Sequence, residues 1–438
     1  MLIMKHLKLF ILALALLPSL FLGAQTVRDD VSLRISHSDG IYAKGENVQV
    51  WADVKRVPEA ALFLCKYKFC SKNAETKEPI TLHEGENLVF EGSFDEPVHY
   101  IFEITDGVHP RVFKDEGKGN AHIGIVVAPE EFKVGFDTCE GREEFWAKEL
   151  KVMRREKMKP SITNDKEEKG FRTYHVDINC VGPAPVRAYV SHPTDARKGS
   201  LPIIINLHAA GSPGGASLAS VALQYAKCVE GGALAADINA HGMLDDQPKE
   251  YYVALNKGEL KDYSGRVPEL ENYHFKWMML RDIRLIDYLT KNPLWDGKHI
   301  ILTGGSQGGY QSCFIAGLDP RISTIIVRVP AGLDQGATLQ GRSASWPKTM
   351  YNYPEETKQF IPYFDPSVTL RNTKADIWCE IGLFDYTCPA ANLFAVMNTV
   401  SSPKTIITCQ RPHVGYIPGD HKELDRLRWE YFQKAATK

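Results

Sequence analysis

The sequence predicts an α/β fold with a mostly parallel sheet, preceded by a smaller all-β domain. From about residue 170 onward, short apolar strands alternate with longer helical segments, which is typical of a parallel sheet covered by helices on both faces. From about Val27 to Val127 the segments are short and alternate apolar with polar residues, which is typical of antiparallel strands. The chain has 438 residues, 44% of them hydrophobic, so it is long enough to build a core in each part.

The predicted amino-terminal β domain spans residues 25–130. Its clearest strands are Val31–Ile35, Asn47–Val54 and Val98–Ile104. About a hundred residues of such strands predict an antiparallel sandwich that resembles an immunoglobulin-like domain. No set of residues typical of catalysis is visible in it. We favour a packing or spacer role over carbohydrate binding, because a lone Trp51 on a strand gives little support for a sugar platform.

The predicted larger domain spans residues 131–438. An amphipathic helix within Phe136–Arg155 opens it, because its apolar residues recur at helical spacing. The run Pro202–Leu207 is almost continuously apolar, as expected of a strand that is covered on both faces. The other predicted strands are Phe171–Asn179, Val186–Ser191, Ala233–Ile238, a strand ending at Thr303, Thr324–Val329, Ala375–Ile381 and Lys404–Cys409, and the other predicted helices are Ala216–Val229, Phe275–Thr290 and Lys422–Lys434.

The amino terminus has the pattern of a secretory signal peptide over residues 1–24. Basic residues precede an apolar run, Leu9–Leu22, and small residues follow it, which predicts cleavage before Gln25. An uncleaved membrane anchor is disfavoured because the run is short and contains Pro18. A lipoprotein is disfavoured because no cysteine follows the predicted cut. We therefore expect an exported protein, periplasmic or secreted, with no stable membrane insertion after cleavage.

Charge and cysteine content restrict the partners. The formal net charge of -2 gives no electrostatic reason to expect a nucleic acid partner. The nine cysteines are scattered, and none has the spacing of a zinc site, so we expect no metal and no cofactor. Cys65 and Cys70 form the only close pair in the amino-terminal region, and export would permit a disulfide between them. Cys388 lies near a candidate catalytic aspartate, although packing is the favoured role for it.

One apolar strand stops abruptly at a serine framed by glycines, Gly304-Gly305-Ser306-Gln307-Gly308-Gly309. In the Gly-x-Ser-x-Gly pattern a strand enters a sharp turn and leaves as a helix, which holds the serine out at the carboxyl end of the sheet. The alternatives are a glycine-rich loop with an incidental serine or a phosphate-binding loop. The second is disfavoured because no lysine follows. The pattern therefore indicates Ser306 as a nucleophile.

A serine nucleophile needs a base, and the base needs an orienting carboxylate. In a strand-turn-helix setting of this kind the acid and then the histidine follow in the chain, each just past a later strand. Asp385 follows Asp376–Ile381 and His413 follows Thr405–Cys409, so these two are the candidates. A helix cap or turn is the alternative role for Asp385. The rival histidine, His421, is disfavoured because it begins the last predicted helix.

Acyl transfer also needs backbone donors for the oxyanion. The N–H of Gln307, directly after the nucleophile, is one candidate. The loop after Ile203–Leu207 should supply the other, and Ala210 is our choice within it. His208, at the start of this loop, is expected to brace the loop rather than to act as a base.

These motifs together resemble the acetyl xylan esterase and cephalosporin C deacetylase family of carbohydrate esterases. The resemblance rests on Gly304–Gly309, Arg328-Val329-Pro330, Gly382–Asp385 with Cys388-Pro389, and a histidine near the carboxyl end. It covers roughly residue 132 to the carboxyl terminus. It implies an α/β-hydrolase fold, a triad at Ser306, Asp385 and His413, a second oxyanion donor at Ala210, and removal of O-acetyl groups from sugars.

The chain departs from the family pattern around the acyl pocket. It has His208-Ala209-Ala210, Asp237–Gly242 and His413-Val414 where the family carries His-Gly-Tyr, Arg-Gly-Gln and a histidine followed by glutamate. Within these segments, His208, Asn239 and His241 are candidate pocket residues, and loop stabilisation is the alternative for Asn239 and His241. Tyr310, Trp346 and Phe384 could stack against a sugar, with core packing as the alternative for each.

The leading hypothesis is an exported serine esterase that removes O-acetyl groups from carbohydrate. A methyl or glucuronoyl esterase, or a peptidase on the same fold, is the second hypothesis. An acidic sugar would need a cation in the pocket, and the sequence does not place Arg328, Arg342 or Arg411 there. The third is a carbohydrate-binding protein with an inactive hydrolase domain. The acyl group, the glycan and the oligomeric state stay open.

Overall fold

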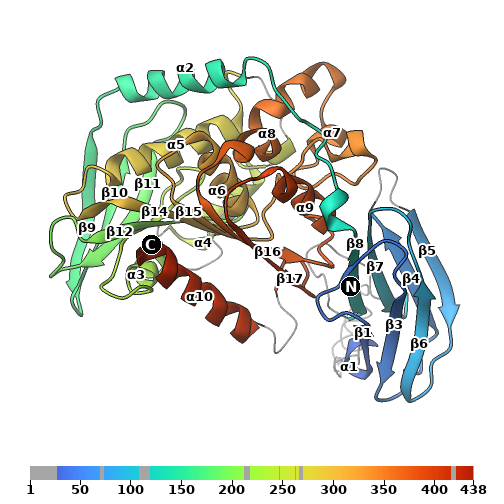
Figure 1. Cartoon of the computed structure of the whole chain (residues 1–438). Helices are drawn as coiled ribbons and strands as arrows, with labels where there is room; N and C mark the ends of the chain where they lie inside the picture. The colour runs from blue at the N-terminus through green and yellow to red at the C-terminus, as the bar shows by residue number, and fades with distance from the viewer. Residues whose placement is uncertain are drawn as a thin grey trace, which may run out of the picture.

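A mixed β-sheet with helices on both faces makes up the larger part of the structure, and two smaller sheets lie beside it (Figure 1). The structure is a computed structural model that describes residues 27–69, 74–107, 119–211, 218–245, 247–261, 263–265, 270–415 and 421–437. The predicted signal peptide and Cys70 lie outside the described residues. Within those residues, no helix is long and apolar enough to cross a membrane.

The larger sheet runs in the order β17-β16-β15-β14-β12-β13-β11-β10-β9 in the described part of the chain. Neighbouring strands from β17 to β13 pair in parallel, and the pairs from β13 to β9 are antiparallel. The strands are β9 Pro160–Glu168, β10 Phe171–Ile178, β11 Val186–Pro193, β12 Leu201–Leu207, β13 Leu234–Ile238, β14 Trp295–Gly305, β15 Thr324–Arg328, β16 Asp376–Gly382 and β17 Lys404–Cys409. This is the α/β architecture that the sequence predicts.

Helices cover both faces of this sheet. On one face lie α5 (His274–Leu289), α6 (Gln307–Leu318) and α9 (Ala390–Thr399), and α2 (Arg142–Arg155) packs outside α5. On the other face lie α3 (Leu218–Ala226) and α10 (His421–Thr437). Shorter helices occupy the connections: α4 Lys249–Lys257, α7 Thr349–Asn352, α8 Pro366–Thr369, and the 3₁₀ helices Pro129–Glu131, Tyr263–Gly265, Ala337–Gln340, Glu355–Phe364 and Leu370–Asn372.

The sequence prediction differs from the structure at the start of the larger domain, in α2 and β9. The helix predicted within Phe136–Arg155 begins only at Arg142, directly after Gly141, whose positive φ of 75° is not helical. Strand β9 is absent from the prediction because its residues, PSITNDKEE, are polar and exposed throughout. It is an edge strand held by its pairing with β10, and such a strand carries no apolar alternation that a sequence could reveal.

The amino-terminal region forms two sheets that share an apolar core. One contains β1 (Val31–Ile35), β3 (Val48–Val54) and β6 (Gly85–Gly92), and the other contains β2 (Ile41–Tyr42), β8 (Ala121–Val127), β7 (Val98–Thr105), β4 (Leu62–Lys68) and β5 (Ala74–Ile80). Residues from both sheets meet in the same buried clusters, and the short helix α1 (Val27–Asp30) precedes them. The region is therefore β-rich as predicted, and its immunoglobulin-like classification stays a prediction.

The amino-terminal region packs against the loops that follow β16 and β17. His99 on β7 is 1% exposed, and its Nε2 lies 2.9 Å from the Leu383 carbonyl oxygen. The side-chain amide of Gln410 exchanges two hydrogen bonds with the backbone of Gly124 on β8, each 2.8 Å long. Since Leu383 precedes Asp385 and Gln410 precedes His413, strands β7 and β8 hold the loops that carry both candidate catalytic residues.

We expect the contact of His99 with the loop after β16 to be sensitive to acid. Burial lowers the pKa of His99 from 6.5 to about 4, although its hydrogen bond to Leu383 opposes the shift. Because the unfolded state binds the proton first, the contribution of neutral His99 to stability is complete above pH 6.5 and declines as the pH falls toward 4, by roughly 3 kcal/mol in all. Denaturant unfolding of His99→Gln from pH 7 to pH 4 should show a correspondingly smaller acid loss. An acid loss equal to that of an exposed-site control, His83→Gln, would contradict the assignment.

Gly124 predicts a second effect at the same contact. An ideal Cβ at this position would overlap the carbonyl oxygen of Leu383, so Gly124→Ala must separate β8 from the loop that carries Asp385. We expect a loss of about 1 to 3 kcal/mol in the free energy of unfolding, together with a lower kcat. The control is Gly265→Ala, where a Cβ meets no atom within 4 Å and the backbone φ is not positive. Equal stability of the two variants would argue against the contact.

Candidate active site

Ser306 lies in the turn between β14 and α6, at the carboxyl end of the parallel strands. Its backbone has φ 52° and ψ -120°, a conformation that few residues other than glycine adopt. Three backbone hydrogen bonds hold it: its N–H donates to the Arg328 carbonyl at 3.0 Å, and its carbonyl accepts from Tyr310 and Ala331 at 3.0 and 2.9 Å. The surrounding structure thus fixes a strained serine at the point where a nucleophile elbow requires one.

Gly304 and Gly308 permit this turn because neither position has room for a side chain. A Cβ on Gly304 would lie 2.6 Å from the Leu207 carbonyl oxygen, and one on Gly308 would overlap the same oxygen. The start of α6 therefore lies directly against the end of β12. This contact brings Ser306 close to the loop that follows Leu207.

Asp385 lies in the turn after β16 and is fully buried. Its Oδ1 accepts the backbone N–H groups of Thr387 and Cys388 at 2.8 and 2.7 Å. Hydrogen bonds from backbone amides stabilise a carboxylate where water does not reach it. The other oxygen, Oδ2, lies 2.8 Å from His413 Nδ1. The turn role considered for Asp385 and the contact with histidine are therefore both present, through different oxygens.

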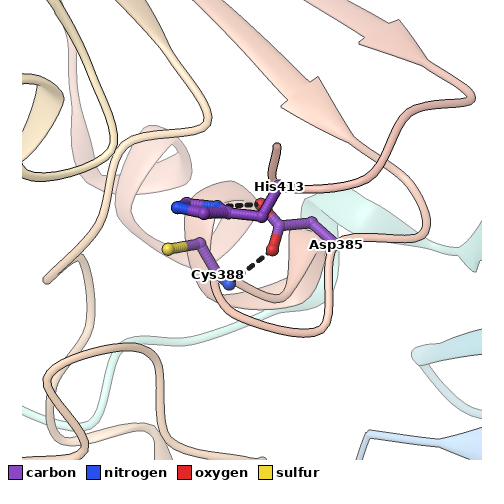
Figure 2. A group of neighbouring side chains, drawn as sticks. All are labelled: Asp385, Cys388 and His413. Atoms are coloured by element: carbon purple, nitrogen blue, oxygen red, sulfur yellow. Dashed lines mark hydrogen bonds and ion pairs between the residues drawn. The ribbon is translucent and has the colours of Figure 1, made fainter. Parts of the chain in front are cut away.

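His413, in the loop after β17, joins Asp385 to Ser306. Its Nδ1 faces Asp385, as Figure 2 shows, and its Nε2 lies 2.8 Å from Ser306 Oγ. Burial alone would lower the pKa of this imidazole, but the buried Asp385 carboxylate, with Cys388, raises it above the ordinary value of 6.5. With Nδ1–H donating to Asp385, Nε2 is left to accept the serine proton. The structure therefore brings the three predicted residues into one hydrogen-bonded chain.

Cys388 completes the group drawn in Figure 2. The possible ligand atoms of Asp385, Cys388 and His413 lie within 4.8 Å of one another, so the group has donors of the kind that metal ions take. Both ring nitrogens of His413 are already engaged, one by Asp385 and one by Ser306. Burial raises the pKa of the Cys388 thiol, so a neutral packing role fits it better than a thiolate ligand.

The two predicted oxyanion donors lie at the start of α6 and in the loop after β12. Gln307 is the first residue of α6, and N–H groups in the first turn of a helix have no acceptor within the helix. The hydroxyl of buried Tyr263 donates to the Gln307 side-chain oxygen. Ala210 lies in the exposed loop after β12 and lines the cavity above Ser306.

His208 braces the loop that carries Ala210, as the sequence suggests. Its Nε2 lies 2.9 Å from the carboxylate of Asp237, which is fully buried and also accepts a 2.7 Å hydrogen bond from Asn206. Burial would lower the pKa of His208, but Asp237 raises it above its ordinary value. The residue therefore anchors β12 to β13, and it does not line the cavity above Ser306.

A cavity of about 580 Å³ opens above Ser306. This volume is within the range of small-molecule sites and can hold a sugar unit with its acyl group. Trp346, predicted as a stacking surface, does line it. The residues around the cavity are Ala209, Ala210, Gly305, Ser306, Arg328, Val329, Trp346, Thr387, Arg411, His413, Val414 and Gly415.

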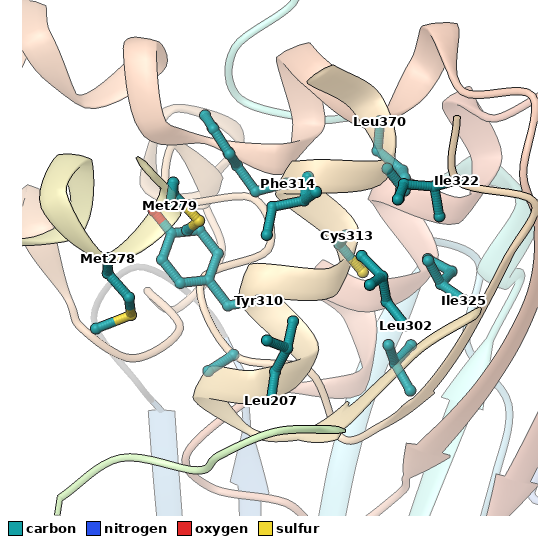
Figure 3. Packing of buried hydrophobic residues seen from close by; sticks show 14 of the residues in the cluster. Leu207, Met278, Met279, Leu302, Tyr310, Cys313, Phe314, Ile322, Ile325 and Leu370 are labelled. Carbon is teal, nitrogen blue, oxygen red and sulfur yellow. The ribbon is translucent and has the colours of Figure 1, made fainter. Parts of the chain in front are cut away.

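Four other predicted pocket residues lie elsewhere. Tyr310 is buried in the core on α6, where its hydroxyl donates to the Phe364 carbonyl at 2.7 Å (Figure 3). Phe384 is 2% exposed and stacks on His122 of β8, on the amino-terminal side of its loop. Asn239 is buried and ties its own loop together through Met243 and Asp245. His241 lines a separate cavity of about 490 Å³ beside His274 and Trp277.

Arg328 and Arg411 line the cavity, although the sequence alone did not show that either arginine lies there. Arg328 is the last residue of β15, so its position at the carboxyl edge of the sheet was open to prediction. Arg411 lies two residues before His413. Arg342, by contrast, pairs with buried Asp334 and donates to the Lys133 carbonyl, away from the cavity.

Comparison with known proteins shows which family this chain resembles. Residues 131–430 match the family model described as acetyl xylan esterase (AXE1). The acetyl esterase Axe7A of Xylanibacter ruminicola is 26% identical over 399 residues, which covers 86% of this chain and 85% of that protein. The acetyl xylan esterase from Paenibacillus sp. R4 has a TM-score of 0.56 at 21% identity and covers 68% of this chain and 97% of that one. For acetyl xylan esterase 1 from Thermoanaerobacterium sp. JW/SL YS485 the TM-score is 0.51 at 20% identity, covering 70% and 98%.

The two solved structures share the α/β-hydrolase fold with this chain. The match to Axe7A covers more than residues 131–438 alone can supply, so it includes part of the amino-terminal region. The family model matches well over half of the sequence. The chain therefore belongs to the acetyl xylan esterase family and is a carboxylic ester hydrolase.

Proposed function

We propose that this protein removes O-acetyl groups from carbohydrate through an acyl-serine intermediate. The observation that carries the proposal is the hydrogen-bonded chain from buried Asp385 through His413 to Ser306, on a strained elbow that opens into a cavity. Membership of the acetyl xylan esterase family supports the acetyl group and the sugar. The name of the relative Axe7A, an acetyl esterase, supports the same acyl group.

In the acylation step, Ser306 Oγ attacks the acyl carbon while His413 Nε2 takes the hydroxyl proton. The Oγ–carbon bond forms, and the carbonyl electron pair moves to oxygen. The backbone N–H groups of Gln307 and Ala210 stabilise the negative charge that results. His413 then gives its proton to the sugar oxygen as the ester bond breaks, and the sugar leaves with a free hydroxyl group.

Deacylation repeats these roles with water. His413 takes a proton from a water molecule, whose oxygen attacks the acyl-serine carbon, and acetate leaves as Ser306 recovers its proton. Asp385 holds the imidazole with Nδ1–H toward itself and stabilises the imidazolium in both steps. The backbone N–H groups of Thr387 and Cys388, which donate to Asp385, keep its carboxylate in place in both steps.

Three further proposals concern the organisation of the chain. Residues 1–24 direct export and are then removed, residues 25–130 form an immunoglobulin-like sandwich, and residues 131–438 form the esterase domain. The sequence of the first 24 residues supports export to the periplasm or beyond. The face-to-face packing of the two small sheets supports the sandwich.

Replacement of Ser306 is the direct test. We expect Ser306→Ala to lower kcat for acetate release from acetylated xylan by about 10⁴-fold or more, because no acyl-enzyme can form. The variant should also fail to react with a fluorophosphonate probe. Ser200→Ala, at an exposed site before β12, is the matched control. Near-native acetate release by Ser306→Ala would refute the mechanism, and release of methanol in place of acetate from esterified plant polysaccharide would favour the methyl esterase hypothesis.

The pH profile tests the roles of Asp385 and His413. Catalysis needs His413 neutral, and its pKa is raised above 6.5, so kcat/KM should fall with decreasing pH in a limb that lies above pH 6.5. Asp385→Asn removes the charge that raises this pKa and the acceptor that fixes the tautomer. We expect kcat to fall by about 10³- to 10⁴-fold and the limb to move to lower pH. The measurement is hydrolysis of 4-nitrophenyl acetate from pH 5 to pH 9, and an unmoved limb would contradict the role of Asp385.

A further inference from the structure

The cavity above Ser306 is cationic. Two arginines, Arg328 and Arg411, line it together with His413, and none of the described lining residues is an aspartate or glutamate. The one carboxylate of the triad, Asp385, is fully buried beneath His413. Within the described part of the chain, a ligand in the cavity therefore meets positive charge and no acidic side chain in the lining.

Arg328 lies next to the nucleophile. Its carbonyl accepts the Ser306 N–H, and it pairs in register with Gly305. A Cβ built on Gly305 would be 4.0 Å from Arg328 Nε, so the side chain runs along the space that this glycine leaves open. Arg328 is half-buried, and it lines the cavity.

Within the described residues, no carboxylate lies within ion-pair distance of Arg328. Its neighbour on β16 is the buried Glu380, which is paired instead with Arg428 of α10 at 2.6 Å and with Arg411 at 3.6 Å. Arg411 also donates to the Pro412 carbonyl oxygen. Of these two arginines, Arg411 thus interacts with groups of the protein itself, and Arg328 supplies the positive charge that a ligand can bind.

We infer that Arg328 selects substrates in which the acetylated sugar carries a carboxylate, as a uronic acid does. A guanidinium at a cavity wall binds a carboxylate through two parallel N–H···O hydrogen bonds, and burial of the pair strengthens them. Arg328 then orients the sugar so that its ester reaches Ser306. This inference rests on the proposed function and specifies its substrate class.

The test compares two sugars of nearly the same shape. The substrates are an O-acetylated methyl glucuronoside and its uronamide, in which an amide replaces the carboxylate, and the readout is acetate release. The native enzyme should have a kcat/KM at least about 10-fold higher for the acid, mainly through KM. In Arg328→Gln the preference for the acid over the amide should fall to within about twofold. Arg426→Gln, which removes a positive charge from the exposed face of α10, should keep the native preference.

A second measurement uses the native enzyme alone and does not depend on how the variant folds. The preference for the acid should decline as sodium chloride rises from 50 to 500 mM, because salt screens the charge of the ligand in an open cavity. Equal kcat/KM for acid and amide in the native enzyme, or an unchanged preference in Arg328→Gln, would overturn the inference and leave the proposed function intact. If Arg328 served only Glu380, Arg328→Gln would lower stability and affect both sugars equally. Release of acetate from neither sugar nor from acetylated xylan would instead refute the proposed function.

Discussion

The contact between the end of β12 and the start of α6 is the constraint on which the rest of the site depends. Gly308 lies so close to the Leu207 carbonyl that no side chain fits between them. That closeness places the first amide of α6 beside the loop that begins at His208. It therefore sets where the nucleophile stands relative to both candidate oxyanion donors. The strained backbone of Ser306 is tolerated because β15 supplies an acceptor for its N–H and the chain after β15 supplies a donor for its carbonyl.

The acid and base are positioned from a different direction. Their loops follow β16 and β17, at the edge of the sheet that faces the amino-terminal region (Figure 1). There the imidazole of His99 contacts the Leu383 carbonyl oxygen, and the Gly124 N–H donates to the side chain of Gln410. Phe384 packs in one buried cluster with Phe69 and Tyr386 at this contact. The amino-terminal sheets thus support the loops that carry Asp385 and His413.

The parts of the site that follow from chain order could be predicted from the sequence. Parallel strands bring their carboxyl ends to one edge, so residues directly after apolar strands, such as Asp385 and His413, had to lie near Ser306. The sequence could not predict whether an aromatic side chain lines the cavity or packs in the core. Tyr310 and Phe384 lie close to these same turns, and each side chain could have pointed toward either. The contact of His99 with Leu383 joins positions 284 residues apart, and no local pattern encodes such a pairing.

The distribution of charge connects these features. Glu380 on β16 and Asp385 in the turn after β16 are both fully buried acids. Two backbone amides and His413 compensate Asp385, and Arg428 and Arg411 compensate Glu380. Buried carboxylates without such partners would take up protons, and the triad would lose the charge that orients its histidine. Both acids have partners inside the protein, and Arg328 lines the cavity above Ser306. The pairing of these acids within the protein therefore leaves Arg328 available to a ligand in the cavity.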